Sequence, residues 1–207
     1  MTKIMEPLRH DLVGFIRSRD EVSNIIGKLI SQTFRVDIIQ AESKQVDIGD
    51  INISANYDPD LDSMDRPCIE LILVYNPLDP VVLFDEELFT TITKRLCDSI
   101  SHEQIHQQQH RARFWESWYY DTDNEEQYLA NKDEIDAFSL NITNELLDYT
   151  DAKNALTLLQ YPSTIKIEHS VNLWAYIKTF KGNVTHPVIK RLLKKVVKLL
   201  PVVEQQR

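Results

Sequence analysis

The chain has 207 residues, of which 43% are apolar and 27% are charged, as is typical of globular proteins that bury a core. Its net charge of −9 argues against nucleic acid as the main partner, because phosphate binding needs a basic protein surface. Two cysteines are too few for a disulfide framework, and no run approaches the ~20 apolar residues of a membrane span. Because no apolar segment near the N-terminus would direct secretion, we expect a cytoplasmic protein.

The first part of the chain changes from a helical to a strand-like period. Apolar residues spaced as on a helix predict helices over about 7–16 and 20–30. Period-two alternation in "TFRVDIIQ" (33–40) and "DINISANY" (50–57) then predicts two strands, each with one buried face. "CIELILVYN" (68–76) is nearly continuous in apolar residues, which predicts a central strand buried on both faces.

Helical periods dominate the rest of the chain. From Asp85 the apolar spacing is helical, and no breaker interrupts it before about His110. A second long helix is predicted over about 131–149, with Ile135 and Phe138 on its buried face, and three further helices within 151–200. The order of helices, three strands and again helices indicates an α+β fold.

The stretch "SISHEQIHQQQH" (99–110) places His102, Glu103 and His106 in an H-E-x-x-H pattern inside the first of these long helices. Residues four apart on a helix are neighbours, so both imidazoles can reach one ion. At ~100° per residue, both histidines also lie close to the apolar line of Leu88, so they continue the buried stripe. A buried polar cluster is costly unless it is paired or binds a metal. The alternative is a solvated helix face that matches by chance.

This pattern is the zincin signature, in which two histidines hold Zn²⁺ and the glutamate takes a proton from a zinc-bound water. A catalytic zinc site needs three protein ligands, so one must come from elsewhere in the chain. The metzincin spacing, with a third histidine after a glycine turn, is excluded because position 109 is glutamine and no glycine breaks the helix.

A glutamate from the next long helix is the other common third ligand. Glu134 lies at the edge of the apolar stripe of that helix, whereas Asp133 points away from it, so Glu134 is the predicted ligand. Glu145 shares the stripe and is the reserve candidate. Asn131 followed by Glu134 also fits a capping box, in which the glutamate would satisfy its own helix N-terminus.

A mixed sheet followed by an H-E-x-x-H helix and a glutamate helix resembles the gluzincins, in the compact form called a minigluzincin. "DEIDAFSLNITNELL" (133–147) is similar to the E-x-x-A-x-x-F-A type helix of the ImmA/IrrE-like metallopeptidases, with Glu134 and Ala137 at matching positions. Short sequences with H-E-x-x-H and D-E-I-x-A also occur among metallopeptidase-like proteins of tailed phages. A phage-encoded protein would act in the host cytoplasm.

The resemblance implies a zincin-like fold: N-terminal helices, a small three-stranded mixed sheet, the H-E-x-x-H helix and the glutamate helix. Residues 1–150 would form the metallopeptidase domain, and 151–207 a helical extension packed on it. Zincins hold their substrate as an extra strand on a sheet edge, which either 50–57 or 68–76 could provide. Phe138 stands where a supporting aspartate would lie, so the groups that orient the histidines stay unassigned.

By the same resemblance, Zn²⁺ is bound by His102, His106 and Glu134, and Glu103 activates a zinc-bound water that hydrolyses a peptide or protein substrate. An alternative of a different class is a non-catalytic zincin-like module for binding or assembly, such as a virion or regulatory component. Glu103 favours catalysis, because a purely structural metal site has no use for a glutamate that activates water.

Two further segments stand out. The connection over 114–128 contains Trp115, Trp118, Tyr119, Tyr120 and Tyr128, whose rings either wall a substrate cleft or cover the core. The last helix carries an apolar stripe, and the chain has seven basic and no acidic residues between 178 and 198. An apolar stripe at helical spacing predicts that this helix packs on the domain; the alternative is a basic helix that binds anionic surfaces.

Overall fold

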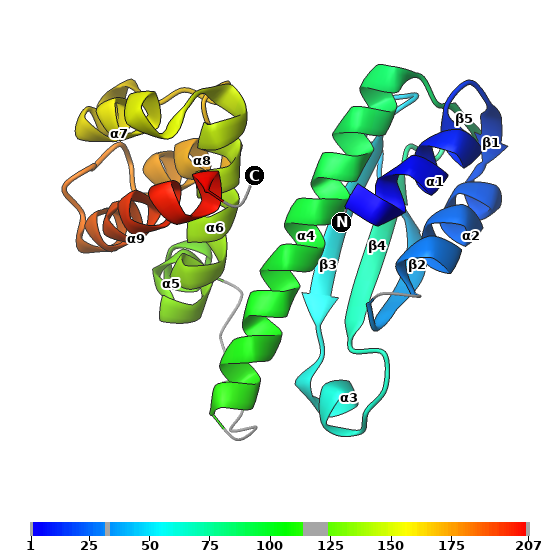
Figure 1. The fold of residues 1–207 in the computed structure, drawn as a ribbon, viewed down its shortest axis with the longest axis horizontal. Coiled ribbons are helices and arrows are strands. Elements are labelled where there is room, and N and C mark those ends of the chain that lie inside the picture. The colour runs from blue at the N-terminus through cyan, green and yellow to red at the C-terminus, as the bar shows by residue number, and fades with distance from the viewer. Residues whose placement is uncertain (1, 32–33, 114–123, 206–207) are drawn as a thin grey trace. The chain divides into compact units, whose positions relative to one another are not determined.

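Residues 2–31, 34–113 and 124–205 are described by the computed structural model of the chain (Figure 1). The chain forms two compact units, Met1–Glu116 and Ser117–Arg207, each with its own hydrophobic core. Described strands occur in the first unit and helices in both, so the predicted α+β class is confirmed.

The first unit combines helices with short strands. Its elements in chain order are α1 (Thr2–Leu12), β1 (Ile16–Ser18), α2 (Arg19–Ile30), β2 (Val36–Glu42), β3 (Ile51–Tyr57), α3 (Pro59–Ser63), β4 (Ile69–Tyr75), β5 (Val81–Leu83) and α4 (Glu86–Ala112).

The first helix ends earlier than its apolar spacing predicted. Gly14 follows α1 with a φ of +85°, a left-handed conformation that glycine adopts without strain and that ends helices. Its N–H donates to the carbonyl of Phe84 at 2.8 Å. Ile16 therefore lies in strand β1, which pairs antiparallel with β5, and the prediction of a helix over 7–16 is wrong at its C-terminal end.

The main sheet has the strand order β2–β4–β3. Strands β2 and β4 run parallel, and β3 runs antiparallel to β4, so the predicted small mixed sheet is confirmed. Strand β4 lies in the centre, as its apolar run predicted, and both β2 and β3 are edge strands.

The two faces of this sheet differ in burial. One face of β4 carries Leu71, Leu73 and Tyr75, which are fully buried. On the other face Glu70 is exposed and Ile72 is only half-buried. The prediction that β4 is buried on both faces is therefore wrong for one face, because its charged residue keeps that face accessible to water.

Helices α2 and α4 cover the buried face. Val22 and Ile26 of α2 and Ile92, Leu96 and Ile100 of α4 belong to one apolar cluster with the buried side chains of β4. Figure 1 shows α4 alongside β3 and α2 alongside β2. Helix α4, with the H-E-x-x-H motif, is thereby placed next to an edge strand.

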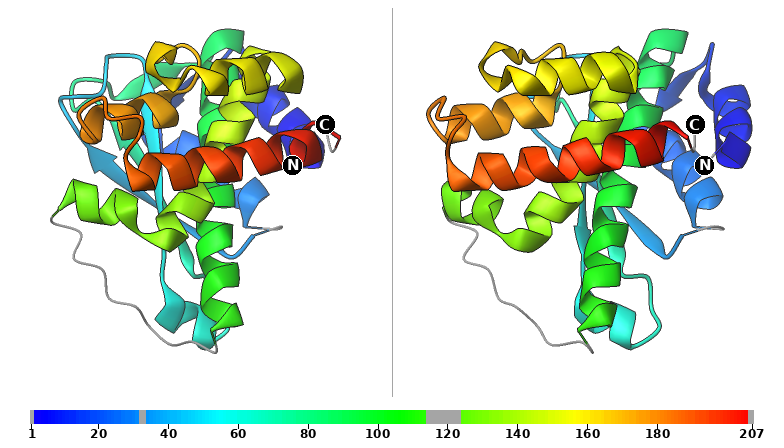
Figure 2. Two further views of the ribbon diagram at one scale, coloured as in Figure 1. Left: turned by 90° about the vertical axis from the view of Figure 1, so that its left-hand side faces the viewer. Right: turned by 60° about the vertical axis from the view of Figure 1, so that its left-hand side comes forward.

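The second unit is helical. Helix α9 lies across α6, as both views of Figure 2 show, and these two helices make its most extensive helix pair. Its elements are α5 (Glu125–Ala130), α6 (Lys132–Tyr149), α7 (Ala152–Gln160), the 3₁₀ turn η1 (Pro162–Thr164), α8 (Val171–Thr179) and α9 (Pro187–Glu204).

The core of the second unit includes both α6 and the segment after it. Ile142 and Leu146 of α6 belong to one apolar cluster with Leu192 and Val196 of α9. In its packing, α6 therefore groups with the helices that follow it. The domain limit predicted at residue 150, and the packing of 151–207 on the preceding domain, stay predictions.

The apolar stripe of α9 is buried, as its spacing predicted. Ile189, Leu192 and Val196 are fully buried in the core of this unit, whereas Lys190 and Lys194 are exposed.

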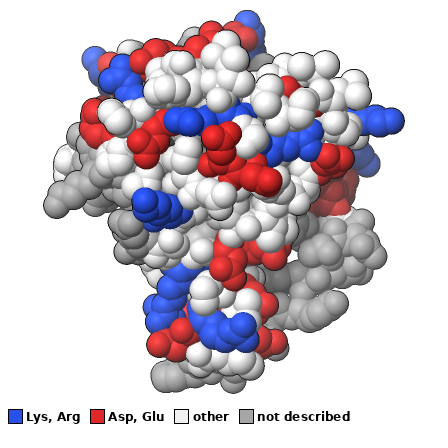
Figure 3. All heavy atoms as spheres, turned by 90° about the vertical axis from the view of Figure 1, so that its right-hand side faces the viewer, with Lys and Arg blue, Asp and Glu red and all other residues white. Residues whose placement is uncertain are grey.

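No helix in the part of the chain that the structure describes has the length and apolarity needed to cross a bilayer. On the face shown in Figure 3, basic and acidic side chains are interspersed rather than gathered into a patch of one sign.

Candidate metal centre

Helix α4 forms because its start is capped and its interior contains no breaker. The Asp85 carboxylate accepts the N–H of Leu88 at 2.8 Å, which satisfies one of the N–H groups left open at a helix start. No glycine or proline follows within the helix, and Ile92, Leu96 and Ile100 are buried. His102, Glu103 and His106 therefore lie in the later turns of one continuous helix.

Side chains hold α4 to the rest of the first unit at two places. Arg95 donates to both carboxylate oxygens of Asp50, the residue before β3, at 2.9 and 3.2 Å. Near the other end, the fully buried carboxylate of Asp62 in α3 accepts from Gln107 at 3.0 Å and from Arg111 at 2.7 Å. The turn that carries the two histidines lies between these anchors.

The two imidazoles face each other at ligand distance. His102 Nε2 and His106 Nε2 are 3.1 Å apart, and the ring centroids are separated by 4.8 Å. Two nitrogen ligands at about 2.0–2.1 Å from one tetrahedral zinc ion lie about 3.3 Å apart. The separation in this structure is close to that value and is also an ordinary N–H···N hydrogen-bond distance, so the pair is compatible with a shared ion.

Gln109 supplies a contact that the sequence did not reveal. His106 Nδ1 lies 3.0 Å from Gln109 Oε1, one helical turn further along α4. An amide oxygen can only accept a hydrogen bond, so this contact favours the tautomer of His106 that carries its proton on Nδ1. The Nε2 lone pair of His106 is then the one available to a metal. The i, i+3 spacing was the only sequence signal for this contact.

Glu103 is buried beside His102, with 8% of its surface exposed. The predicted burial of the motif is confirmed for His102, which is 7% exposed, and for Glu103, whereas His106 is half-buried. A solvated helix face that matches the motif by chance is inconsistent with this burial.

Glu134 lies in the first turn of α6 and is 5% exposed. The alternative capping box is not formed, because the N–H of Asn131 that it would bind donates to the carbonyl of Tyr128 at 3.1 Å. Burial, and the nearby charge of Glu134, raise the pKa of Tyr176 well above its ordinary value. Asp133 is also 5% exposed, so burial alone does not distinguish it from Glu134, and the prediction that it points away from the apolar stripe stays a prediction.

Glu145, the reserve candidate, serves the N-terminus of α8. Its carboxylate accepts from the hydroxyl of Ser170, from the Asn172 N–H at 3.2 Å and from the Asn172 side-chain amide at 2.8 Å. These bonds satisfy donors at a helix start, which is a structural role. Among the two glutamates, the geometry therefore favours Glu134 as the third ligand.

His102, His106 and Glu134 form a group in which each residue offers one ligand atom, and these atoms all lie within 4.8 Å of one another. Among the residues that the structure describes, no other histidine, cysteine or acidic residue joins a group of three. Two imidazoles and a carboxylate match the donor set of catalytic zinc sites, although other transition metals also accept it. The group fits a divalent ion, and the identity of that ion stays a prediction.

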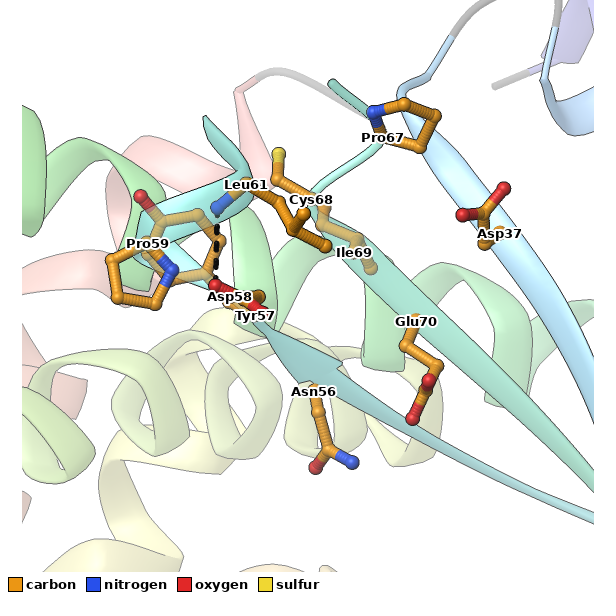
Figure 4. Close-up of a pocket in the computed structure, with 10 residues that line it drawn as sticks. All are labelled: Asp37, Asn56, Tyr57, Asp58, Pro59, Leu61, Pro67, Cys68, Ile69 and Glu70. Atoms are coloured by element: carbon orange, nitrogen blue, oxygen red, sulfur yellow. Dashed lines mark hydrogen bonds between the residues drawn. The ribbon is translucent and has the colours of Figure 1, made fainter. Parts of the chain in front are cut away.

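A separate cavity of about 310 Å³ lies in the first unit, at the ends of β3 and β4 (Figure 4). Asp37 and Glu70, adjacent in register on β2 and β4, and Asn56 of β3 line it. Asp58 also lines it, but its carboxylate caps α3 by accepting the N–H of Leu61 at 3.1 Å. This cavity is an acidic recess and does not contain the H-E-x-x-H residues.

No family model, no curated protein and no solved structure matches this chain. The resemblance to minigluzincins therefore depends on the motif residues alone and stays a prediction. Of the aromatic connection, Trp115, Trp118, Tyr119 and Tyr120 lie outside the described residues.

Proposed function

We propose that this protein is a zinc-dependent metallopeptidase that hydrolyses peptide bonds. His102, His106 and Glu134 would hold the ion, and Glu103 would be the general base. The observation that carries the proposal is the 3.1 Å separation of the two histidine Nε2 atoms, in a group that a carboxylate ligand completes. The buried Glu103 next to the pair is the feature that a purely structural zinc site would not need.

The chemistry follows from the roles that these side chains can take. A bound zinc ion would act as a Lewis acid that lowers the pKa of a water molecule from ~15.7 to about 7. The Glu103 carboxylate would accept the proton of that water as it attacks the peptide carbonyl, and then give it to the leaving amine. His102, His106 and Glu134 would stay in place as fixed ligands.

The topology of the first unit supports an extended peptide as the substrate. Strand β4 is central and β3 is an edge strand, so of the two segments considered, only β3 can pair with another strand. Asp58, just beyond β3, donates its N–H to Cys68 O at 2.8 Å. Along a strand, the N–H and C=O groups of successive residues point alternately to its two sides. Because Asp58 points to β4, the N–H and C=O groups of Ala55 and Tyr57 point to the outer edge of β3.

This edge runs beside the histidine turn. Arg95 of α4 donates to the carbonyl of Ile51 at the start of β3. At the end of β3, the ring centroids of Tyr57 and His110 are 5.7 Å apart. The backbone from Ile51 to Tyr57 therefore runs alongside the part of α4 that contains His102. We propose that a peptide substrate adds to β3 as a further strand of the sheet. We also propose that nucleic acid is not a main partner, and that the protein acts in the cytoplasm.

The test is the variant Glu103→Gln in the full-length protein. We expect it to bind zinc like the wild type but to hydrolyse an unbiased peptide library about 10²–10⁴-fold more slowly, because the proton acceptor is lost. Glu87→Gln makes the same change at an exposed position in the first turn of α4 and should leave hydrolysis unchanged. Metal content by mass spectrometry and peptide cleavage would be measured on all three proteins.

Two results would count against the enzyme. Undiminished hydrolysis by Glu103→Gln would show that Glu103 is not the base. If the wild type binds one zinc ion per chain and cleaves no member of the library, a non-catalytic zincin-like binding or assembly module becomes the better description.

A further inference from the structure

We infer that Gln109 is the positioning residue for His106: its side-chain oxygen holds the proton on Nδ1 and so directs the Nε2 lone pair toward the metal. This inference rests on the proposed zinc site and adds to it a residue outside the H-E-x-x-H motif. It also supplies the orienting group that the sequence left unassigned for this histidine.

The geometry of the contact carries the inference. His106 Nδ1 and Gln109 Oε1 are 3.0 Å apart, which is an ordinary N–H···O distance. The opposite ring atom, Nε2, is the one that lies 3.1 Å from Nε2 of His102. One side of the imidazole is thus held by the amide while the other side meets the second ligand.

The protonation state of a neutral imidazole explains why this matters for a metal. Only one ring nitrogen carries the proton, and the nitrogen that binds a metal must be the other one. An acceptor at Nδ1 stabilises the form whose Nε2 is free of a proton. Outer partners of this kind typically change metal affinity 10- to 100-fold.

The three consecutive glutamines after His106 have three different environments. Gln107 donates to Asp62 at 3.0 Å and to the Cys68 sulfur at 3.3 Å, so it connects α4 to α3 and to the residue before β4. Gln108 is exposed. Gln109 alone among them contacts a candidate ligand, which makes its neighbour a matched control.

The experiment compares Gln109→Ala, Gln109→Glu and Gln108→Ala in the full-length protein. Zinc affinity at pH 7 would be measured by competition with a chelator, and the tautomer of His106 in the zinc-free protein by nitrogen-15 NMR. We expect Gln109→Ala to weaken zinc binding about 10- to 100-fold and to reduce the fraction of His106 protonated at Nδ1. Gln109→Glu, which keeps an acceptor, should restore both, and Gln108→Ala should match the wild type.

Thermal unfolding of the zinc-free variants separates positioning from a loss of fold. The inference is overturned if Gln109→Ala keeps both the zinc affinity and the Nδ1–H tautomer of the wild type. It is also overturned if Gln108→Ala has the same effect as Gln109→Ala. A wild type that binds no zinc would instead refute the proposed function, and the tautomer measurement would still decide the role of Gln109.

Discussion

Glu134 and Glu145 lie eleven residues apart on α6 and have distinct surroundings. The carboxylate of Glu145 accepts hydrogen bonds from Ser170 and Asn172 at the start of α8. Glu134 is buried, is not used in a capping box, and shares a group of possible ligand atoms with His102 and His106. Removing a carboxylate that only stabilises the fold should lower stability and leave zinc binding unchanged. Removing a carboxylate that binds the metal should weaken zinc binding.

Replacing each glutamate with alanine should therefore separate zinc binding from stability. Loss of a residue that hydrogen-bonds a metal ligand weakens metal binding by up to about 100-fold. We expect Glu134→Ala, which removes a ligand itself, to weaken zinc binding by more than this. Glu145→Ala should keep its zinc and lose about 1–2 kcal/mol of unfolding free energy, because donors at the N-terminus of α8 lose their acceptor. Chelator competition and urea unfolding of the zinc-free proteins would measure the two quantities.

The reverse outcome is equally informative. If Glu145→Ala loses its zinc and Glu134→Ala keeps it, the assignment of the third ligand is wrong. Asp133→Ala is the matched control, because Asp133 is as buried as Glu134 and precedes it on the same helical turn.

At the scale of elements, the orientation of α4 depends on a buried carboxylate in the short helix α3. Asp62 accepts hydrogen bonds from Arg111 and Gln107 of α4 and from the Tyr57 hydroxyl at 3.0 Å, and Arg35 lies 3.8 Å away. Burial alone would raise the pKa of Asp62, but the hydrogen bonds from Arg111, Tyr57 and Gln107 hold that pKa below its ordinary value. The ionised form of Asp62 thus stabilises the folded protein.

The pKa shift of Asp62 implies a direction for the dependence of stability on pH. A carboxyl with a lowered pKa in the folded state contributes its stability above the unfolded pKa of about 3.9, and this is lost as the pH falls through the folded pKa. Asp62→Asn should cost about 2 kcal/mol at pH 7, because Arg111 loses its charged partner. The variant should also lose less stability than the wild type when the pH is lowered from about 6 to about 3.

Urea unfolding across this pH range would check the prediction. Asp60→Asn is the control, because Asp60 is an exposed acid of the same helix α3. Parallel pH curves for the wild type and Asp62→Asn would contradict a role for the ionised Asp62, since the wild type would then gain nothing from its charge.

At the scale of the whole molecule, features with a strong period or a defined spacing were predictable from sequence. The helices over 86–112 and 132–149, the three strands and the central place of β4 follow from apolar periodicity. The relation of His102 to His106 follows from helix geometry, since both lie within one uninterrupted helix.

Features that depend on tertiary partners were not predictable. The early end of α1 comes from the positive φ of Gly14 and from the pairing of β1 with β5, which no local period encodes. The roles of Gln109 and Asp62 depend on side chains brought together by the fold. Glutamines and acids at such positions are compatible with an ordinary solvated surface when only the sequence is known.

If His102, His106 and Glu134 bind one ion only in the folded protein, zinc must stabilise the folded chain by mass action. At a free zinc concentration 100-fold above the dissociation constant, the gain is about 2.7 kcal/mol. We expect zinc to raise the Tm of the wild type and a chelator to reverse the increase. His106→Ala should show no such response, and Glu103→Gln should respond like the wild type, since Glu103 is not a ligand. An equal response from His106→Ala would mean that zinc binds elsewhere on the protein, because no ligand pair would then remain on α4.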